Sequence, residues 1–385
     1  MKKEIKLVND TISNQDIDSL IEWLKTYPRL TKGPLTEEFE KEWSEWLGVK
    51  HSVFVNSGSS ANLMMLYALK IAKKFRNNKV VVPALAWATD LAPVIQLGFE
   101  PILIDANKDN LSVSIKELEY VFKRDKPSVF ILVSVLGLPP NMTELQKLCK
   151  KHGVYLLEDV CESLGSRHKD KKLGTFGSMS SFSTYFGHHM STIEGGMVCT
   201  DDDELYKILK MIRSHGWDRD LNTNEKKELR EKWDVDEFSS LYTFYEPGFN
   251  LRSTDLQAHI GLSQIKKLDK IIEKRNQNYC HFEKLLSSKL IWFPNIPKSD
   301  FVSSFCIPIV HKNKKEIIKR LQDENIEVRP LIAGSMGTQP FYVSRYGYDE
   351  KKHCSTLDEF GFYVPNHPGL EFKDIKRICD IILEN

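Results

Sequence analysis

The sequence predicts an α/β fold, with a large domain built on a mostly parallel, mixed sheet and a smaller α+β domain after it. Short β-rich runs alternate with helical stretches through the first half of the chain, which is typical of a parallel sheet covered on both faces. The length of 385 residues suits roughly two or three domains of about 150 residues each. Near residue 255 the texture changes to a long helical stretch rich in Lys and Ile.

Apolar runs predict strands at residues 52–55, 79–82, 102–104, 129–133 and 154–157. Helices are expected between them at residues 60–76, 85–96, 114–124 and 142–152. In the second half, a long helix at 256–279 precedes extended segments at 302–310 and 326–329 and helices at 314–324 and 372–383. We therefore expect a large domain over residues 1–262, N-terminal segment included, and a small domain over residues 263–385.

Charge and hydropathy argue against several functional classes. The 54 Lys and Arg residues nearly cancel the 53 Asp and Glu residues, so the basic excess typical of nucleic-acid binders is missing. No apolar run approaches the ~20 residues of a membrane helix, and the N-terminus lacks the apolar segment of a secretory signal. The seven cysteines, without any Cys-x-x-Cys spacing, suit free thiols in a reducing compartment. We expect a soluble, cytoplasmic protein with neither nucleic acid nor membrane as partner.

The segment 56–62 (NSGSSAN) follows the first predicted strand and opens a helix. A helix N-terminus presents unpaired N–H groups and the positive end of the helix dipole, and Gly58 lets the backbone approach an anion closely. The pattern is compatible with a phosphate cradle and also with an ordinary N-cap turn.

Two further motifs follow predicted strands, where ligands gather in parallel sheets. Asp159 ends the fifth strand, where a carboxylate can hold a proton on the ring nitrogen of a cofactor or cap the next helix. Cys161, in the same turn, is interpreted as a packing residue rather than a nucleophile. Farther along, His188 and His189 are adjacent, but neighbouring side chains of an extended segment diverge, which argues against a metal site.

In this order and spacing, the motifs resemble the DegT/StrS-type sugar aminotransferase family, which has the aspartate-aminotransferase (type I) fold. The resemblance covers nearly the whole chain. It rests on residues 33–40 (GPLTEEFE), 57–62 (SGSSAN), 83–87 (PALAW), 158–159 (ED), 194–196 (EGG), 215–216 (HG) and 248–258 (GFNLRSTDLQA).

The resemblance implies a set of residues around a pyridoxal 5′-phosphate cofactor: Gly58, Ser59, Trp87, Asp159, Glu162, Ser183 and Asn250. In the family, the glycine and serines hold the phosphate, the tryptophan stacks on the pyridine ring, and the aspartate pairs with its nitrogen. Asn250 would reach the phosphate from a partner subunit, so a homodimer with a shared active site is implied.

The chain departs from the family at the cofactor lysine, which should lie six residues before the Glu of Glu-Gly-Gly. That position is His188, and no lysine occurs between residues 173 and 206. A Schiff base needs a primary amine, so an imidazole cannot form one, but it can act as base and then as acid. His189 is the rival for this role; in an extended segment its side chain would point away. Glu162 is a second departure, because the family usually has Gln there, facing the ring hydroxyl of the cofactor.

Both departures resemble a lysine-less subgroup, the 3-dehydratases of GDP-linked 4-keto-6-deoxyhexoses in colitose-type pathways of lipopolysaccharide O-antigen synthesis. This implies pyridoxamine 5′-phosphate bound without a covalent link, His188 as the base, glutamate as amino donor, and release of ammonia. Another lysine-less subgroup acts on CDP sugars with an iron–sulfur cluster, which needs closely spaced thiolates. Here the nearest cysteines, Cys149 and Cys161, are twelve residues apart, so we expect no metal.

Three arginines are candidates for substrate binding, because a guanidinium can bind phosphate or carboxylate through two hydrogen bonds. Arg219 and Arg329 are candidates for the diphosphate, and Arg252 for the glutamate carboxylate; each could equally be a surface ion-pair partner. Two other functions stay open: a nucleotide-sugar aminotransferase that uses a lysine from elsewhere, and a catalytically silent relative that binds a sugar nucleotide.

Overall fold

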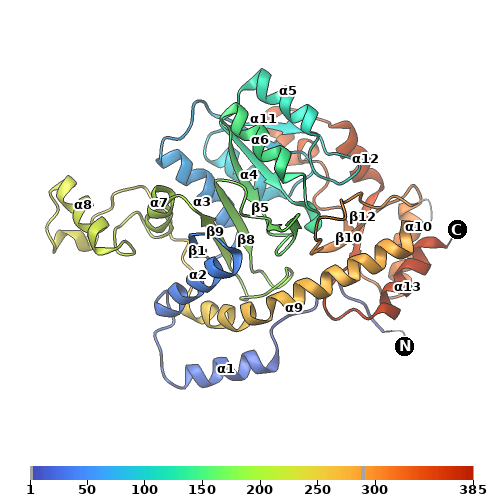
Figure 1. Cartoon of the computed structure of the whole chain (residues 1–385), viewed down its shortest axis with the longest axis horizontal. Coiled ribbons are helices and arrows are strands. Elements are labelled where there is room, and N and C mark those ends of the chain that lie inside the picture. Colours follow the sequence, from blue (N-terminus) through green and yellow to red (C-terminus); the bar gives the residue numbers. More distant parts are fainter. Residues whose placement is uncertain (1–2, 288–290, 385) are drawn as a thin grey trace.

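The structure, a computed structural model, describes residues 3–287 and 291–384. Within them a seven-stranded sheet has the order β1-β9-β8-β5-β4-β2-β3, of which Figure 1 labels β1, β9, β8 and β5. Its strands are β1 (His51–Val55), β2 (Lys79–Pro83), β3 (Glu100–Ile104), β4 (Val129–Val133), β5 (Tyr155–Asp159), β8 (Met179–Ser183) and β9 (Gly196–Thr200). β9 is antiparallel to both of its neighbours, while the other strands share one direction. The carboxyl ends of the parallel strands therefore meet at one edge of the sheet.

Helices cover both faces of this sheet because successive strand residues point to opposite sides. Val80 and Val82 pack in one apolar cluster with α3 (Gly58–Ile71), α4 (Ala88–Gln96) and α7 (Asp203–Arg213). Val81 packs in a second cluster on the other side. The helices of that second cluster are α2 (Pro34–Leu47), α5 (Ile115–Asp125), α6 (Met142–His152) and the first half of α9 (Asp255–Leu286).

The second half of the chain forms a smaller antiparallel sheet with helices around it. Its strands are β10 (Cys306–Val310), β12 (Gly361–Pro365) and β11 (Arg329–Pro330), in that order. Its helices are α10 (Lys314–Asp323), α11 (Pro340–Tyr346), α12 (Lys352–Phe360) and α13 (Phe372–Leu383). The long helix α9 contacts α2, which covers one face of the large sheet, and also contacts α13 of this small unit.

Three peripheral features complete the fold. The N-terminal segment joins the small unit, because Ile5 pairs with Ile326 through a β-bridge. Helix α1 (Asn14–Leu24) packs on α9, and a short hairpin consists of β6 (Arg167–His168) and β7 (Lys171–Lys172). Helix α8 (Thr223–Trp233) stands on a lobe that projects away from the sheet (Figure 1).

The α/β prediction is confirmed, and each predicted strand of the first half lies within two residues of an observed one. The expected helix 60–76 runs instead from Gly58 to Ile71, because Lys73 adopts a left-handed backbone with φ of 53°. The expected domain boundary after residue 262 would fall inside α9 and stays a prediction. No helix of the described residues has the length and apolar character needed to cross a membrane.

Candidate functional site

A cavity of about 720 Å³ opens where the carboxyl ends of the parallel strands face the small unit. From the large sheet, Asp159 ends β5 and Ser183 ends β8. Phe305, just before β10, and Tyr363 of β12 line the cavity from the small unit, and residues 6–8 of the N-terminal segment complete the wall. This is the place where an open α/β sheet binds its ligand.

One wall of the cavity is the N-terminus of α3. The hydroxyl of Ser57 caps the helix by accepting the N–H of Ser60 at 3.1 Å. A Cβ atom on Gly58 would lie 2.7 Å from Cβ of Ser183 and 3.0 Å from Sγ of Cys161, so only glycine fits there. The amides of the first helical turn have no acceptor within the helix, and the small side chains around them leave room for an anion.

Asp159 is buried in the same cavity with both carboxylate oxygens fixed. Its Oδ1 accepts the N–H of Cys161 at 2.9 Å, and its Oδ2 accepts a proton of the Asn62 amide at 2.6 Å. The Asn62 amide is itself oriented by Ser181, whose hydroxyl donates to Oδ1 of Asn62 at 2.5 Å. From the sequence, Asn62 is not identified as the residue that holds Asp159. Its place in the NSGSSAN motif, one helical turn after Gly58, is the signal that could have identified it.

Trp87 lines the cavity from the start of α4, where it is the N-cap residue. The side chain is 54% exposed, unlike Ala84, Leu85 and Ala86 before it, which are fully buried. An aromatic ring that is left open inside a cavity suits stacking on a flat ligand.

The two histidines lie on a loop of turns and bends between β8 and β9, so the condition of an extended segment, under which their side chains would diverge, is not met. His188 lines the cavity, and its Nδ1 is buried without a hydrogen-bond partner in the described residues. Burial, with a smaller contribution from the charge of Arg275, lowers the pKa of His188 to about 4, although the nearby Asp159 charge opposes this. The imidazole is therefore neutral at pH 7 and able to accept a proton.

His189 differs from its neighbour in every respect that matters for catalysis. It is fully buried, and its Nε2 lies 3.0 Å from the carbonyl oxygen of Ser303, to which it donates. This bond ties the loop to the chain just before β10. Burial lowers the pKa of His189 well below its usual value, so it stays neutral and serves as an anchor.

Glu162 and Cys161 complete the floor of the cavity. Oε2 of Glu162 accepts the N–H of Leu136 at 2.7 Å. Burial, and to a smaller extent the charge of Asp159, raises the pKa of Glu162 to about 7. Burial also raises the pKa of Cys161 well above its usual value, so this thiol stays protonated and is no nucleophile.

The three candidate arginines do not meet in one place. Arg329, on β11, lines the cavity of His188. Arg219 and Arg252 instead line a second cavity of about 230 Å³, together with Arg29, Lys32 and Trp217. There the guanidinium of Arg219 lies 3.7 Å from the centre of the Trp217 ring.

Asn250 belongs with the second group of residues. It is exposed, and its Oδ1 accepts the Nε–H of Arg252 at 3.1 Å. Within one chain, therefore, Asn250, Arg219 and Arg252 do not line the cavity of His188.

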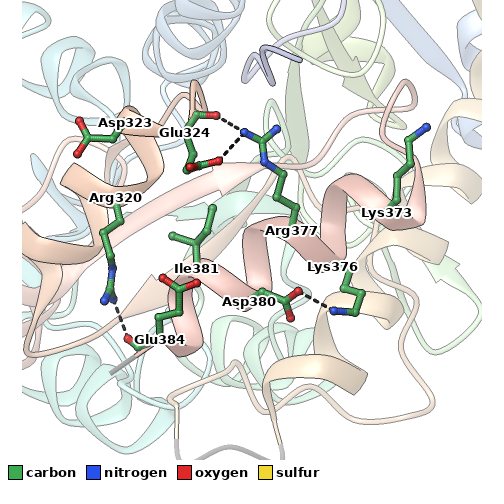
Figure 2. A pocket seen from close by; sticks show the side chains of 9 residues that line it. All are labelled: Arg320, Asp323, Glu324, Lys373, Lys376, Arg377, Asp380, Ile381 and Glu384. Atoms are coloured by element: carbon green, nitrogen blue, oxygen red, sulfur yellow. Dashed lines mark hydrogen bonds and ion pairs between the residues drawn. The ribbon is translucent and has the colours of Figure 1, made fainter. Parts of the chain in front are cut away.

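A third cavity, of about 500 Å³, lies on the small unit between α10 and α13 (Figure 2). Its charged side chains largely neutralise one another. Arg377 pairs with Glu324 at 3.0 Å, and Lys376 pairs with Asp380 at 2.6 Å, as the dashed lines in Figure 2 mark. It has no aromatic wall, and we assign it no ligand.

The comparison with known proteins agrees with this geometry. The family model described as "DegT/DnrJ/EryC1/StrS aminotransferase family" matches residues 10–383. The chain belongs to the DegT/DnrJ/EryC1/StrS aminotransferase family. The resemblance inferred from the sequence motifs is thereby confirmed.

Three members or structural neighbours of the DegT/DnrJ/EryC1/StrS family are especially similar. The GDP-4-keto-6-deoxy-D-mannose 3-dehydratase of Yersinia pseudotuberculosis is 34% identical over 364 residues, which are 91% of each chain. A crystal structure of a His-to-Asn variant of GDP-4-keto-6-deoxymannose-3-dehydratase with bound GDP-perosamine has a TM-score of 0.90 at 28% identity, covering 99% of this chain and 100% of that one. A structure of this dehydratase with a trapped PLP–glutamate geminal diamine has the same score and identity, covering 98% and 99%.

Proposed function

We propose that this chain is a pyridoxamine 5′-phosphate-dependent 3-dehydratase of a nucleotide-linked 4-keto-6-deoxyhexose. Its preferred substrate would be GDP-4-keto-6-deoxymannose, with glutamate as amino donor and ammonia as a product, in dideoxysugar synthesis. The observation that carries this proposal is His188, a neutral imidazole in the cavity on a loop that contains no lysine. The similarity to the 3-dehydratases supports the choice of reaction and substrate.

The residues of the cavity fit a phosphorylated pyridine. The N-terminus of α3 at Gly58 and Ser59, with Ser183, would hold the phosphate. The open ring of Trp87 would stack on the pyridine, and the fixed carboxylate of Asp159 would face its nitrogen. Glu162 would lie at the ring hydroxyl. When bound, the cofactor supplies a primary amine that condenses with the keto group and an electron-poor ring that stabilises negative charge.

His188 would move the proton that dehydration requires. Because its pKa lies at about 4, the imidazole is free to accept a proton from carbon at neutral pH. The same imidazole, once protonated, would deliver that proton to the departing 3-hydroxyl of the sugar. Asp159 would meanwhile keep the ring nitrogen protonated, and Arg329 would bind the substrate from the small unit.

The working unit in this proposal is a cytoplasmic homodimer with shared active sites. Asn250, Arg219 and Arg252 lie away from the cavity of their own chain, as expected of residues that serve the cavity of a partner. The lobe that carries α8 exposes large apolar side chains, with Phe238 82% and Tyr242 78% exposed, which suits burial against a second copy. The seven cysteines are all free, in keeping with a reducing compartment.

The rival function is a nucleotide-sugar aminotransferase that recruits a lysine from elsewhere. One specific observation gives it a candidate, because Lys6 of the N-terminal segment lines the cavity. Its ammonium lies 3.7 Å from Glu4, and the side chain is largely exposed. Borohydride reduction of the protein with pyridoxal phosphate, followed by peptide mass mapping, separates the two functions: covalent cofactor on Lys6 would favour the aminotransferase.

The direct test uses the purified chain with pyridoxal phosphate, glutamate and GDP-4-keto-6-deoxymannose. We expect ammonia release and a 3-deoxy sugar nucleotide at equal rates. A 4-amino sugar without ammonia would contradict the dehydratase, and neither product with any nucleotide sugar would favour the catalytically silent relative. Competition by GDP, CDP, UDP and dTDP, with GDP expected to bind best, tests the nucleotide.

A further inference from the structure

A second carboxyl group lies beside Asp159 in the cavity. Asp90, in the first turn of α4, lines the cavity and is only 1% exposed. Its Oδ2 accepts the N–H of Trp87 at 3.0 Å, which is the bond of a capping box. Such a cap uses one oxygen and needs no proton, whereas an Asp side chain is seldom fully buried unless it has a partner. The cap alone therefore does not explain the burial of Asp90.

The partner of Asp90 is Asp159. The Asn62 amide joins the two, with its nitrogen 2.6 Å from Oδ2 of Asp159 and 3.4 Å from Oδ1 of Asp90. Within the described residues the charged neighbours that act on Asp90 are the acids Asp159 and Glu162, with no Lys or Arg side chain among them. Two adjacent carboxyl groups in a buried site cannot both ionise without a cation between them.

The surroundings of Asp90 favour its protonated form. Burial first, and then the charge of Asp159 and a hydrogen bond with it, raise the pKa of Asp90 well above its ordinary value. The more distant charge of Glu162 acts in the same direction. A neutral Asp90 has one oxygen for the Trp87 amide and one O–H group to donate.

We propose that Asp90 is a positioning residue: as a neutral acid it donates a hydrogen bond to Asp159 and so orients that carboxylate toward the cofactor's ring nitrogen. This role rests on the cofactor of the proposed function. Asp159 then has three donors around it, from Cys161, Asn62 and Asp90, which hold its carboxylate in place. An ionised Asp90 would instead repel Asp159 and turn it away.

The test is a binding cycle between Asp90 and the ring nitrogen, measured by equilibrium dialysis without any substrate. The ligands are pyridoxal phosphate and its 1-deaza analogue, in which carbon replaces the ring nitrogen. The proteins are the parent chain, Asp90→Ala and Asp90→Asn. Asp374→Ala is the control for a lost capping bond, because Asp374 accepts the N–H of Glu371 at 3.1 Å in the capping box of α13 and does not line the cavity; it also removes an ion pair with Lys3, at 2.8 Å.

We expect Asp90→Ala to weaken pyridoxal phosphate binding about tenfold or more, since a hydrogen bond to a charged group is lost. Binding of the deaza analogue should change far less. Asp90→Asn should restore the affinity for pyridoxal phosphate, because its amide can donate to Asp159 while its carbonyl accepts the Trp87 N–H. The control variant should bind both ligands as the parent does.

Two results would overturn the role of Asp90. Equal losses for both ligands in Asp90→Ala would mean that Asp90 only caps α4. A loss in Asp90→Asn as large as in Asp90→Ala would mean that Asp90 acts as a carboxylate. Failure of the proposed function gives a different result. If Asp90→Ala weakens the binding of pyridoxal phosphate alone, but the parent chain releases no ammonia, then the role of Asp90 is supported and the dehydratase is contradicted.

Discussion

The cavity of His188 and the cavity of Arg219 and Arg252 differ in the sign and the burial of their charges. The first is lined by five acidic residues, among them Asp90, Asp159 and Glu162, and by the neutral imidazole of His188, with Lys6 and Arg329 as its cations. The second is smaller and is formed mainly by cations, among them Arg29 and Lys32. Within one chain, the first cavity thus contains the groups that suit the cofactor ring and proton transfer. Most of the candidate anion-binding arginines line the second cavity instead.

This difference teaches that burial, rather than residue type, decides what each cavity can do. In the first cavity burial lowers the pKa of His188 to about 4 and raises that of Glu162 to about 7. At pH 7 the imidazole is therefore neutral, and the carboxyl group can gain or lose a proton. An Arg side chain keeps its charge in any surroundings and suits the binding of diphosphate or carboxylate. The following predictions test whether the two cavities do separate work.

The largest effect is expected from His188→Asn, which removes the proposed base and keeps a polar side chain in the cavity. Dehydration, measured as ammonia release with glutamate and the GDP sugar, should fall about a thousandfold, the range of general acid–base catalysis. Binding of pyridoxal phosphate should change little, because His188 belongs neither to the proposed phosphate cradle at the start of α3 nor to the proposed contact between Asp159 and the ring nitrogen.

The matched control for this change is His189→Asn, one residue along the same loop. His189 donates to the carbonyl of Ser303 and does not line the cavity, so its loss should lower the melting temperature more than the rate. If the rate falls more in His189→Asn than in His188→Asn, then His188 is not the base.

A smaller loss, about a hundredfold, is expected from Arg252→Ala, which removes a cation of the second cavity. If that cavity serves a partner subunit, mixing unfolded Arg252→Ala and His188→Asn chains and refolding them together should restore activity. Each hybrid dimer would contain one intact site and one doubly damaged site. Activity that stays at the level of the separate variants would mean that each chain works with its own Arg252.

The cofactor side of the site could be predicted from the sequence because it depends on local motifs. A strand followed by a small-residue helix start is compatible with a phosphate cradle at Gly58, and an acid at the end of a buried strand with a ring partner at Asp159, but only the family resemblance selects these roles over ordinary capping. The alternation of strand and helix likewise predicts the large sheet, since it is a local pattern. In the structure Gly58, Asp159 and His188 line one cavity, whereas Asn250, from another of the motifs, does not line it.

The rest depends on contacts between segments far apart in the chain. Asp90 looks like an ordinary capping residue until α4 is packed beside β5. The loop of His188 cannot be distinguished from a strand by its composition, and its shape depends on His189 reaching Ser303, 114 residues away. β9, antiparallel in the sheet, has no local signal of its direction.

A tenfold effect is expected from Trp87→Ala, measured as the affinity for pyridoxal phosphate. The ring is the exposed aromatic surface at the head of α4, and loss of stacking and apolar contact is worth about 1 to 2 kcal/mol. Trp87→Phe should recover most of the affinity, whereas Trp217→Ala, in the second cavity, should leave it unchanged. Equal losses in Trp87→Ala and Trp217→Ala would mean that Trp87 has no special contact with the cofactor.

The smallest effects are expected in the pH dependence of stability, where His188 and Glu162 should act with opposite signs. His188 has a folded pKa of about 4 against an ordinary 6.5, so its folded form holds fewer protons than the unfolded chain between these values. Stability from this group is therefore complete above pH 6.5 and is lost as the pH falls toward 4. Glu162 has a folded pKa of about 7 against 4.5, so its contribution is complete below pH 4.5 and is lost as the pH rises through 7.

Urea unfolding of the cofactor-free protein between pH 4 and 8 measures both contributions. The free energy of unfolding of the parent minus that of His188→Asn should rise by about 2 kcal/mol from pH 4 to 6.5, after allowance for partial exposure. The parent minus Glu162→Gln should fall by about 2 kcal/mol from pH 4.5 to above 7, by the same reasoning. Because every other ionisable group is common to each pair, the subtraction isolates one side chain. Slopes of the same sign would contradict the view that burial keeps this imidazole without its proton and this carboxyl with one, and with it the proton chemistry proposed for the cavity.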